Sequence, residues 1–190
     1  MGRWQPDARG RLERAALELF GEVGFNQATA AGIAARAGLT ERTFFRHFAD
    51  KREVLFGGAG ELQELLAREV RDAPRSQAAP LDAIAAALEA AGPVFEERRA
   101  FVRQRQGVIA DNVELQEREL IKLARLSSAL AGALRDHGVP DWPATLAAET
   151  GVALFKTAFQ RWIDDPDARE FAPLVRRSLA ELKAVTADSL

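Results

Sequence analysis

The chain has 190 residues, of which 47% are hydrophobic and 28% are charged, with a net charge of −2 and no cysteine. A chain of this length can bury roughly 70% of its unfolded surface, so it can form a core without disulfides. The lack of cysteine excludes disulfides, thiolate zinc sites and cysteine nucleophiles, and it suits a reducing cytoplasm.

The sequence shows no targeting or membrane segment, so we expect a cytoplasmic protein with no membrane partner. The N-terminal residues MGRWQPDARGR contain no apolar run of the kind found in a signal peptide. No later stretch approaches the roughly 20 uncharged residues that a membrane-spanning helix needs.

Positive charge is slightly concentrated at the N-terminal end. Residues 1–56 carry nine Arg and Lys against seven Asp and Glu, which leaves a net charge of −4 for the remainder. This asymmetry is consistent with a local basic footprint for an anionic partner on an otherwise acidic chain. It is too small to assign a function without a motif.

Apolar residues recur at helical spacing along the chain, which predicts an all-α fold. The first helix spans 8–23 and ends at Gly24, where a left-handed C-cap is expected. Asp50 and Glu53 resemble a capping box that opens another helix. Segment 72–80 is the best linker candidate. The remaining helices are predicted at about 81–91, 93–110, 113–136, 142–163 and 167–186.

Residues 29–51 contain two short helical patterns joined by the turn Ala37-Gly38-Leu39-Thr40. Thr29 and Thr40 are good N-caps for the two helices. The small side chain of Ala34 and the permissive backbone of Gly38 suit two helices that cross steeply over a short turn. These features predict a helix-turn-helix.

The second of these helices exposes an unusual face. Phe44 and Phe48 lie one turn apart and point inward. The outward face carries an aromatic ring together with two guanidinium groups, in the set Glu41, Arg42, Thr43, Phe45, Arg46 and His47. Arginine can bond a guanine edge in a bidentate manner, and threonine or phenylalanine can contact a thymine methyl group. This face is therefore the candidate for entering a DNA major groove.

Residues 17–55, reading LxLFxEVGFxxAT…IAxxAGLTxRTFFRHFxDKxxVL, resemble the DNA-binding domain of the TetR family of transcriptional regulators. The resemblance implies an all-helical homodimer of about nine helices per chain. Residues 1–56 would form a three-helix helix-turn-helix domain, and residues 57–190 a regulatory domain for ligand binding and dimerisation. The implied function is a regulator, in the family's common form a repressor, that binds a palindromic double-stranded DNA operator and is released by a small-molecule effector.

The resemblance also implies roles for individual residues. Phosphate contacts fall to Thr29, Thr40, His47 and Lys51, and contacts with bases or the adjoining backbone fall to Arg42, Thr43, Phe45 and Arg46. Two of these positions depart from the common pattern, because Phe45 stands where tyrosine is frequent and Arg42 where glycine is frequent. The first change removes a phenol hydroxyl that would bind phosphate, and the second adds a charged group that can read bases.

The run Gly57-Gly58-Ala59-Gly60 follows the DNA-binding segment. It is not a phosphate-binding loop, because no strand precedes it and no Lys-Ser/Thr pair follows. We hypothesise that its three glycines soften the connection between the DNA-binding and regulatory domains.

Helix 93–110 carries an apolar stripe that Arg98 and Arg105 interrupt. A buried cation needs a partner, and two alternatives remain open. Arg105 pairs with Glu119 on the next helix, or Arg98 or Arg105 faces a cavity and meets the anionic group of an effector. The candidate pocket would suit a mostly apolar molecule, and its residues are Phe95, Arg98, Phe101, Arg105, Val108, Leu123 and Leu126.

The last two predicted helices carry more large apolar residues than one core needs. The resemblance implies that they pair with their copies across a twofold axis. The expected dimer interface comprises Leu154, Phe155, Phe159, Trp162, Phe171, Leu174, Val175 and Leu179. The alternative is burial of these residues within one chain.

Other classes of protein fit the sequence less well. No catalytic nucleophile, paired-carboxylate set or metal-ligand cluster is recognisable, so we expect no enzyme activity, no metal and no cofactor. A helical module that binds a protein partner and has lost DNA affinity is the alternative function. The missing hydroxyl at Phe45 is its only support.

Overall fold

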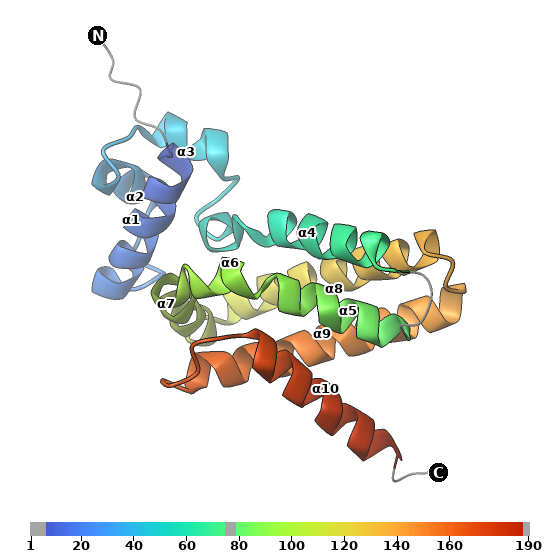
Figure 1. The fold of residues 1–190 in the computed structure, drawn as a ribbon. Helices are drawn as coiled ribbons and strands as arrows, with labels where there is room; N and C mark the ends of the chain where they lie inside the picture. The colour runs from blue at the N-terminus through green and yellow to red at the C-terminus, as the bar shows by residue number, and fades with distance from the viewer. Residues whose placement is uncertain (1–6, 75–78, 188–190) are drawn as a thin grey trace. The chain divides into compact units, whose positions relative to one another are not determined.

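The computed structural model describes residues 7–74 and 79–187. These residues form ten α-helices, α1–α10, and one 3-10 helix, η1, with no strand among them (Figure 1). The all-α prediction is therefore confirmed. The chain divides into two compact units: unit 1 runs up to Gly58 and includes Ala100–Glu119, and unit 2 comprises Ala59–Arg99 and Leu120–Leu190.

Unit 1 contains the predicted helix-turn-helix. Its elements are α1 (Ala8–Val23), α2 (Ala30–Arg36), α3 (Glu41–His47), η1 (Glu53–Phe56), nearly all of α7 (Arg99–Ala110) and the first turns of α8 (Val113–Asp136). α2 packs against both α1 and α3, and α1 also packs against η1. Fully buried side chains from these elements form the core, among them Leu12, Leu17, Ile33 and Phe44.

Unit 2 is a helical bundle built around an alanine-rich helix. Its elements are α4 (Ala59–Asp72), α5 (Pro80–Ala90), α6 (Gly92–Glu96), the rest of α8, α9 (Asp141–Asp164) and α10 (Ala172–Ala187). α5 packs against α4, α9 and α10. A Cβ atom added at Gly151 of α9 would lie 2.7 Å from Cγ2 of Ile84 on α5. The small residue therefore permits this close approach of the two helices.

Five aromatic side chains form one end of the unit 2 core. The ring of Phe95 lies 5.4 Å from that of Phe171 and 5.7 Å from that of Phe159, measured between centroids. Phe155 and Trp162 complete the cluster. Arg99 lies against it, with its guanidinium carbon 5.2 Å from the Trp162 ring and Nη2 donating to the Trp162 carbonyl at 3.1 Å.

Three predicted helices have different bounds in the structure. The helix expected after Asp50 is divided into η1 and α4 by the segment around Gly57. The helix expected over 93–110 is divided into α6 and α7. The last helix begins at Ala172 instead of 167, because the preceding backbone leaves the helical path and the Phe171 N–H donates to Oε1 of Glu96 at 2.8 Å.

The predicted linker at 72–80 agrees with the end of α4 at Asp72 and the start of α5 at Pro80, while its central residues 75–78 lie outside the described residues. Within the described part of the chain, no helix combines the length and apolar character needed to cross a membrane.

Candidate DNA-binding surface

The turn between α2 and α3 is defined by local capping. The Thr29 hydroxyl accepts a hydrogen bond from the Gly32 N–H at 3.0 Å, and Thr40 accepts from the Thr43 N–H at 3.2 Å. Both threonines have extended backbone angles, as N-caps require. Gly38 adopts φ 65°, a left-handed conformation that other residues rarely tolerate. The sequence prediction of this turn is confirmed.

Two arginines tie the helix-turn-helix together through distant partners. Arg11 of α1 donates to the carbonyl oxygen of Ala37, the residue that ends α2. This cation sits where the negative end of the α2 dipole and an unpaired carbonyl favour it. Arg36, the last residue of α2, forms a bidentate ion pair with the carboxylate of Glu22 on α1. Both contacts hold the position of α2 against α1.

Lys51 has a structural position in unit 1. Its Nζ donates to the carbonyl oxygens of Phe25, Asn26 and Ala28 at 2.8, 3.1 and 3.1 Å. It also lies 4.5 Å from the centroid of the Phe25 ring. All three N–H donors of the ammonium group therefore serve the loop between α1 and α2. This geometry favours a role in shaping the loop over the predicted contact with phosphate.

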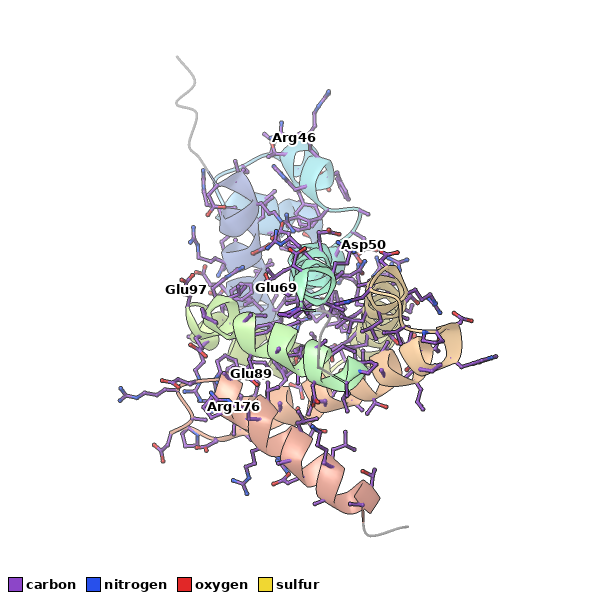
Figure 2. All side chains as sticks on the ribbon, turned by 45° about the vertical axis from the view of Figure 1, so that its right-hand side comes forward. Arg46, Asp50, Glu69, Glu89, Glu97 and Arg176 are labelled. Carbon is purple, nitrogen blue, oxygen red and sulfur yellow. The ribbon has the colours of Figure 1, made fainter. Side chains whose placement is uncertain are left out.

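α3 has one buried and one exposed face. Phe44 and Phe48 are buried, as predicted, and their rings lie 5.6 Å apart. Arg42, Arg46 and His47 are exposed, and Phe45 remains 52% exposed while its ring meets Phe44 edge-on. Figure 2 shows Arg46 on this helix with its side chain directed outward. A half-exposed phenylalanine beside arginines is an unusual solvent face and suits contact with a partner.

The cations on the exposed face of α3 have no competing acid. Among the described residues, neither Arg42 nor Arg46 forms an ion pair, whereas Arg11 and Arg36 are engaged within the fold. Thr29, Thr40 and His47 are exposed as well, and Thr43 is half-buried. Six of the eight residues assigned to DNA by resemblance are thus exposed, and Thr43 and Lys51 are half-buried, with the Lys51 ammonium group bound to carbonyls.

The predicted capping box after α3 is half present. The Asp50 carboxylate accepts from the backbone N–H of Glu53 at 3.1 Å and of Arg52 at 2.8 Å. Burial raises the pKa of Asp50, but the hydrogen bonds from the Arg52 side chain and from these two N–H groups outweigh it, so the pKa lies below its usual value. The Glu53 carboxylate accepts from Nε of Arg118 at 2.5 Å.

Arg105 joins α7 to η1 within unit 1. Its Nε donates to the Leu55 carbonyl at 2.5 Å, its Nη1 lies 3.4 Å from Oε1 of Glu119, and its guanidinium carbon lies 4.9 Å from the Phe56 ring centroid. Burial lowers the pKa of Arg105, and Glu119 partly offsets this. The predicted pairing with Glu119 is confirmed, and it occupies the group that the alternative assigned to an effector.

Gly57 has a packing role in the glycine run. A Cβ atom at this position would lie 2.7 Å from Oε1 of Glu13 and 3.2 Å from the Phe48 ring. No atom lies within 4 Å of the corresponding positions at Gly58 and Gly60. The hypothesis of a soft connection rests most clearly on Gly58 and Gly60, because a side chain at Gly57 would have to displace the Glu13 carboxylate and meet the Phe48 ring.

The residues proposed for an effector pocket are divided between the units. Phe101, Arg105 and Val108 belong to unit 1, and the others, Phe95, Arg98, Leu123 and Leu126, belong to unit 2. Leu126 is buried, and Phe95 is part of the aromatic cluster described above. The helical spacing of apolar residues over 93–110 predicts one helix. The structure has two, α6 in unit 2 and α7 almost wholly in unit 1.

Most residues expected at a dimer interface are buried within the single chain. Trp162, Phe171 and Val175 have no exposed surface. Leu154 and Phe155 are 4% and 8% exposed. A side chain already covered by its own chain offers no surface to a second copy, so these five residues belong to the core of unit 2. Of the expected set, Phe159, Leu174 and Leu179 keep partial exposure.

Several polar contacts that position this surface had no signal in the sequence. The pairs Arg11–Ala37 and Arg118–Glu53 join residues far apart along the chain. Surface arginines carry no period or motif that announces a carbonyl partner. The resemblance assigns Lys51 a phosphate contact, but only the structure shows that its ammonium group donates to three carbonyl oxygens.

The fold and this surface define a helix-turn-helix DNA-binding protein with a helical second unit. Residues 13–56 match the family model described as bacterial regulatory proteins of the tetR family, and residues 78–187 match the model described as the MftR C-terminal domain. The chain therefore belongs to the TetR family of transcriptional regulators. This is a family of regulators and not of enzymes.

Individual relatives agree with this assignment. The HTH-type transcriptional regulator TcmR of Streptomyces glaucescens is 32% identical over 65% of this chain, and the match spans 60% of TcmR. A protein named as a mycofactocin biosynthesis transcriptional regulator, MftR, of Mycobacterium tuberculosis is 29% identical over 87% of this chain and 84% of its own. The solved SmeT–triclosan complex shares the fold, with a TM-score of 0.62 and 21% identity over 92% of this chain and 90% of SmeT.

Proposed function

We propose that this protein represses transcription by binding a palindromic operator as a homodimer, and that a small, mostly apolar effector releases it. The observation that carries the proposal is the exposed face of α3, where two arginines without an acidic partner among the described residues flank a half-exposed phenylalanine. Arg42, Thr43, Phe45 and Arg46 would contact bases or the adjoining backbone.

Phosphate contacts are proposed for Thr29, Thr40 and His47. The first two lie at helix N-termini, where backbone N–H groups and the helix dipole favour an anion. His47 is exposed at the other end of α3. We assign Lys51 an indirect part, because its ammonium group holds the loop that leads into α2.

A homodimer is proposed because one α3 reads too few base pairs for specificity. Two copies would present two such helices about one DNA turn apart, or a small multiple of it, to the halves of a palindrome. The surface that remains for pairing on α9 and α10 includes Phe159, Leu174 and Leu179. Sedimentation at micromolar concentration should give a dimer, and a monomer at that concentration would contradict this part of the proposal.

The proposed effector belongs to the class of small, mostly apolar molecules. A fold relative, SmeT, was solved with triclosan. The effector would have to bind the released state better than the DNA-bound state, since only differential affinity shifts the population between them.

The operator can be sought by selecting bound DNA from a random pool with the full chain. The proposal predicts enrichment of a palindrome whose half-sites are spaced by about one helical turn or a small multiple of it. If no sequence is enriched while the protein remains folded, the chain acts as a partner-binding module and the proposal is wrong. Enrichment of a single asymmetric half-site would support DNA binding and contradict the homodimer.

A further inference from the structure

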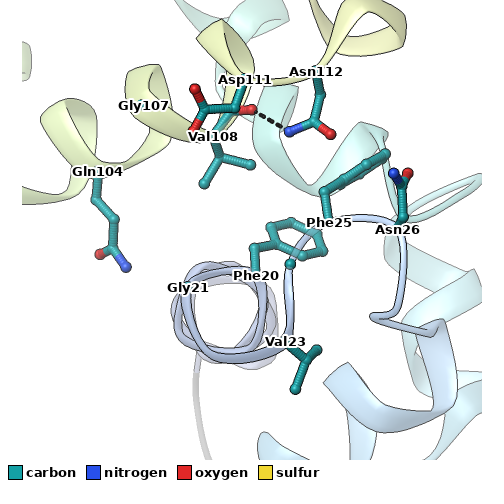
Figure 3. A pocket seen from close by; sticks show the side chains of 11 residues that line it. Phe20, Gly21, Val23, Phe25, Asn26, Gln104, Gly107, Val108, Asp111 and Asn112 are labelled. Atoms are coloured by element: carbon teal, nitrogen blue, oxygen red, sulfur yellow. Dashed lines mark hydrogen bonds between the residues drawn. The ribbon is translucent and has the colours of Figure 1, made fainter.

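Unit 1 contains a concavity that the proposed DNA contacts do not use. It lies between the C-terminal part of α1 with its following loop and the C-terminal part of α7 (Figure 3). Its volume is about 570 Å³, which is within the range of small-molecule sites. None of the residues assigned to DNA lines it.

The polar groups of this concavity include acceptor oxygens that no described residue engages. The side-chain amide nitrogens of Gln104 and Asn112 are already engaged, donating to the carbonyls of Leu17 at 3.2 Å and Val108 at 2.7 Å. Their amide oxygens accept no hydrogen bond from any described residue. The carboxylate of Asp111 is exposed and likewise has no ion pair within the described part of the chain. The carboxylate and these acceptors favour a ligand that brings donors and a positive charge, and the side-chain amide of Asn26, which also lines the concavity, can donate or accept.

The opposite wall is apolar. Phe20 and Phe25 meet edge-on with their centroids 5.2 Å apart, and Val23 is 47% exposed. No lining residue is basic. The nearby ammonium of Lys51 lies against Phe25, but its three donors are bound to carbonyls. This wall suits the hydrocarbon body of a ligand and leaves the acidic side for its cation.

Two glycines open the concavity within helices. Gly21 of α1 and Gly107 of α7 each cost about 1 kcal/mol of helix stability relative to alanine. Packing does not require either one: a Cβ atom at Gly107 would have no neighbour within 4 Å, and one at Gly21 would meet only Gln104 Nε2 at 3.8 Å. Both glycines line the concavity, so a larger side chain at either position would occupy or border this space.

We propose that this concavity binds a small organic cation, an amine on an apolar or aromatic body. The amine would face Asp111 and the amide oxygens of Gln104 and Asn112, and the body would lie against Val23 and Val108. The lining residues all belong to unit 1, and Val108 is the one residue that they share with the effector set of the proposed function.

Titration of the full chain followed by amide NMR tests the proposal. The probe is 2-phenylethylamine, compared with neutral 2-phenylethanol and anionic phenylacetate. Saturable shifts are expected for the amine at residues 20–26 and 104–112, with weaker binding of the alcohol and none of phenylacetate. Asp111→Asn should weaken binding of the amine about tenfold, because one charged contact is lost. Gly107→Leu should abolish binding, because the leucine side chain would occupy space in the concavity.

Two variants serve as controls. Asp136→Asn removes an exposed charge of the same type from α8, and Ala110→Leu adds similar bulk to α7 at an exposed position outside the concavity. Both should bind the amine as the unchanged chain does. Absence of saturable binding, equal binding of phenylacetate, or binding that survives both Asp111→Asn and Gly107→Leu would overturn the proposal. None of these outcomes depends on DNA binding, so the proposed function is tested separately.

Discussion

The two units of this chain both place cations on backbone carbonyls, but they fill their cores differently. In unit 1, the cationic groups of Arg11, Lys51 and Arg105 each reach backbone carbonyls far away in the sequence. Unit 2 has Arg99 in a similar position, with Nη2 donating to the Trp162 carbonyl, and it adds a cluster of aromatic rings and a close approach of α5 and α9 at Gly151. The comparison separates two kinds of cation in unit 1: some bind carbonyls and hold the fold together, whereas Arg42 and Arg46 on α3 form no ion pair with any described residue and are the ones that we propose contact DNA.

The largest effect is expected from removing a buried aromatic side chain from unit 2. Trp162→Ala should lower the free energy of unfolding by about 3–5 kcal/mol, because Trp162 is fully buried among aromatic rings. The measurement is chemical denaturation followed by circular dichroism. Trp142→Ala is the matched control, since that side chain is 81% exposed and its loss should change stability by under about 0.5 kcal/mol. Equal effects of the two variants would contradict the assignment of Trp162 to the core.

Removing a polar contact from unit 1 should have the next largest effect. Lys51→Met keeps the aliphatic stem but leaves three carbonyls without their donor, which should cost about 2 kcal/mol. Thermal unfolding measures this loss, with Lys156→Met on the exposed face of α9 as control. An unchanged stability together with weaker DNA binding would show that Lys51 contacts phosphate directly.

A single methyl group distinguishes close packing from open space in unit 2. Gly151→Ala places a Cβ atom 2.7 Å from Ile84 and should cost about 1–3 kcal/mol through overpacking, less about 1 kcal/mol gained in helix propensity. Gly132→Ala in α8 meets no atom within 4 Å and should stabilise by up to about 1 kcal/mol. The sign of the change in melting temperature separates the two. If Gly151→Ala is also stabilising, α5 and α9 do not pack as described.

The smallest expected effect is a pH dependence in unit 1. The pKa of Asp50 is lowered in the folded state. The ionised carboxylate therefore stabilises the fold fully above the pKa of an aspartate in the unfolded chain, about 3.9. This stabilisation is lost as the pH falls through the lower folded value. Asp50→Asn should therefore reduce stability at pH 7 by under about 1 kcal/mol, because the group is partly exposed, and by less at pH 3. A constant difference between these pH values would show that the ionised carboxylate is not what stabilises the turn.

Local features of the sequence predicted the fold well. The caps at Thr29 and Thr40, the turn at Gly38 and the inward pair Phe44 and Phe48 depend on neighbours a few residues away, and each is present. The boundaries that failed depend on distant contacts. The start of α10, for example, follows a hydrogen bond between Phe171 and Glu96, which no local pattern announces.

The division of apolar residues between core and interface could not be predicted from the sequence. Helical periodicity shows which face of α9 and α10 is apolar, but it does not show whether the same chain or a second copy covers that face. The structure covers Trp162, Phe171 and Val175 with the chain itself. The pairing of Arg105 with Glu119 was accessible from sequence, because both interrupt apolar stripes and a buried cation requires a partner.

The central claim is that the unpaired cations of α3 recognise DNA, and one measurement tests it most directly. The affinity of the full chain for its selected duplex should be measured over a range of salt concentrations for the unchanged protein, Arg46→Ala and Arg103→Ala, the last removing an exposed charge from α7. We predict that Arg46→Ala folds normally and loses affinity by at least about tenfold, as expected for one base or phosphate contact. Arg103→Ala should bind as the unchanged chain does. Equal affinities of all three proteins at every salt concentration would contradict the assignment of α3 as the recognition helix.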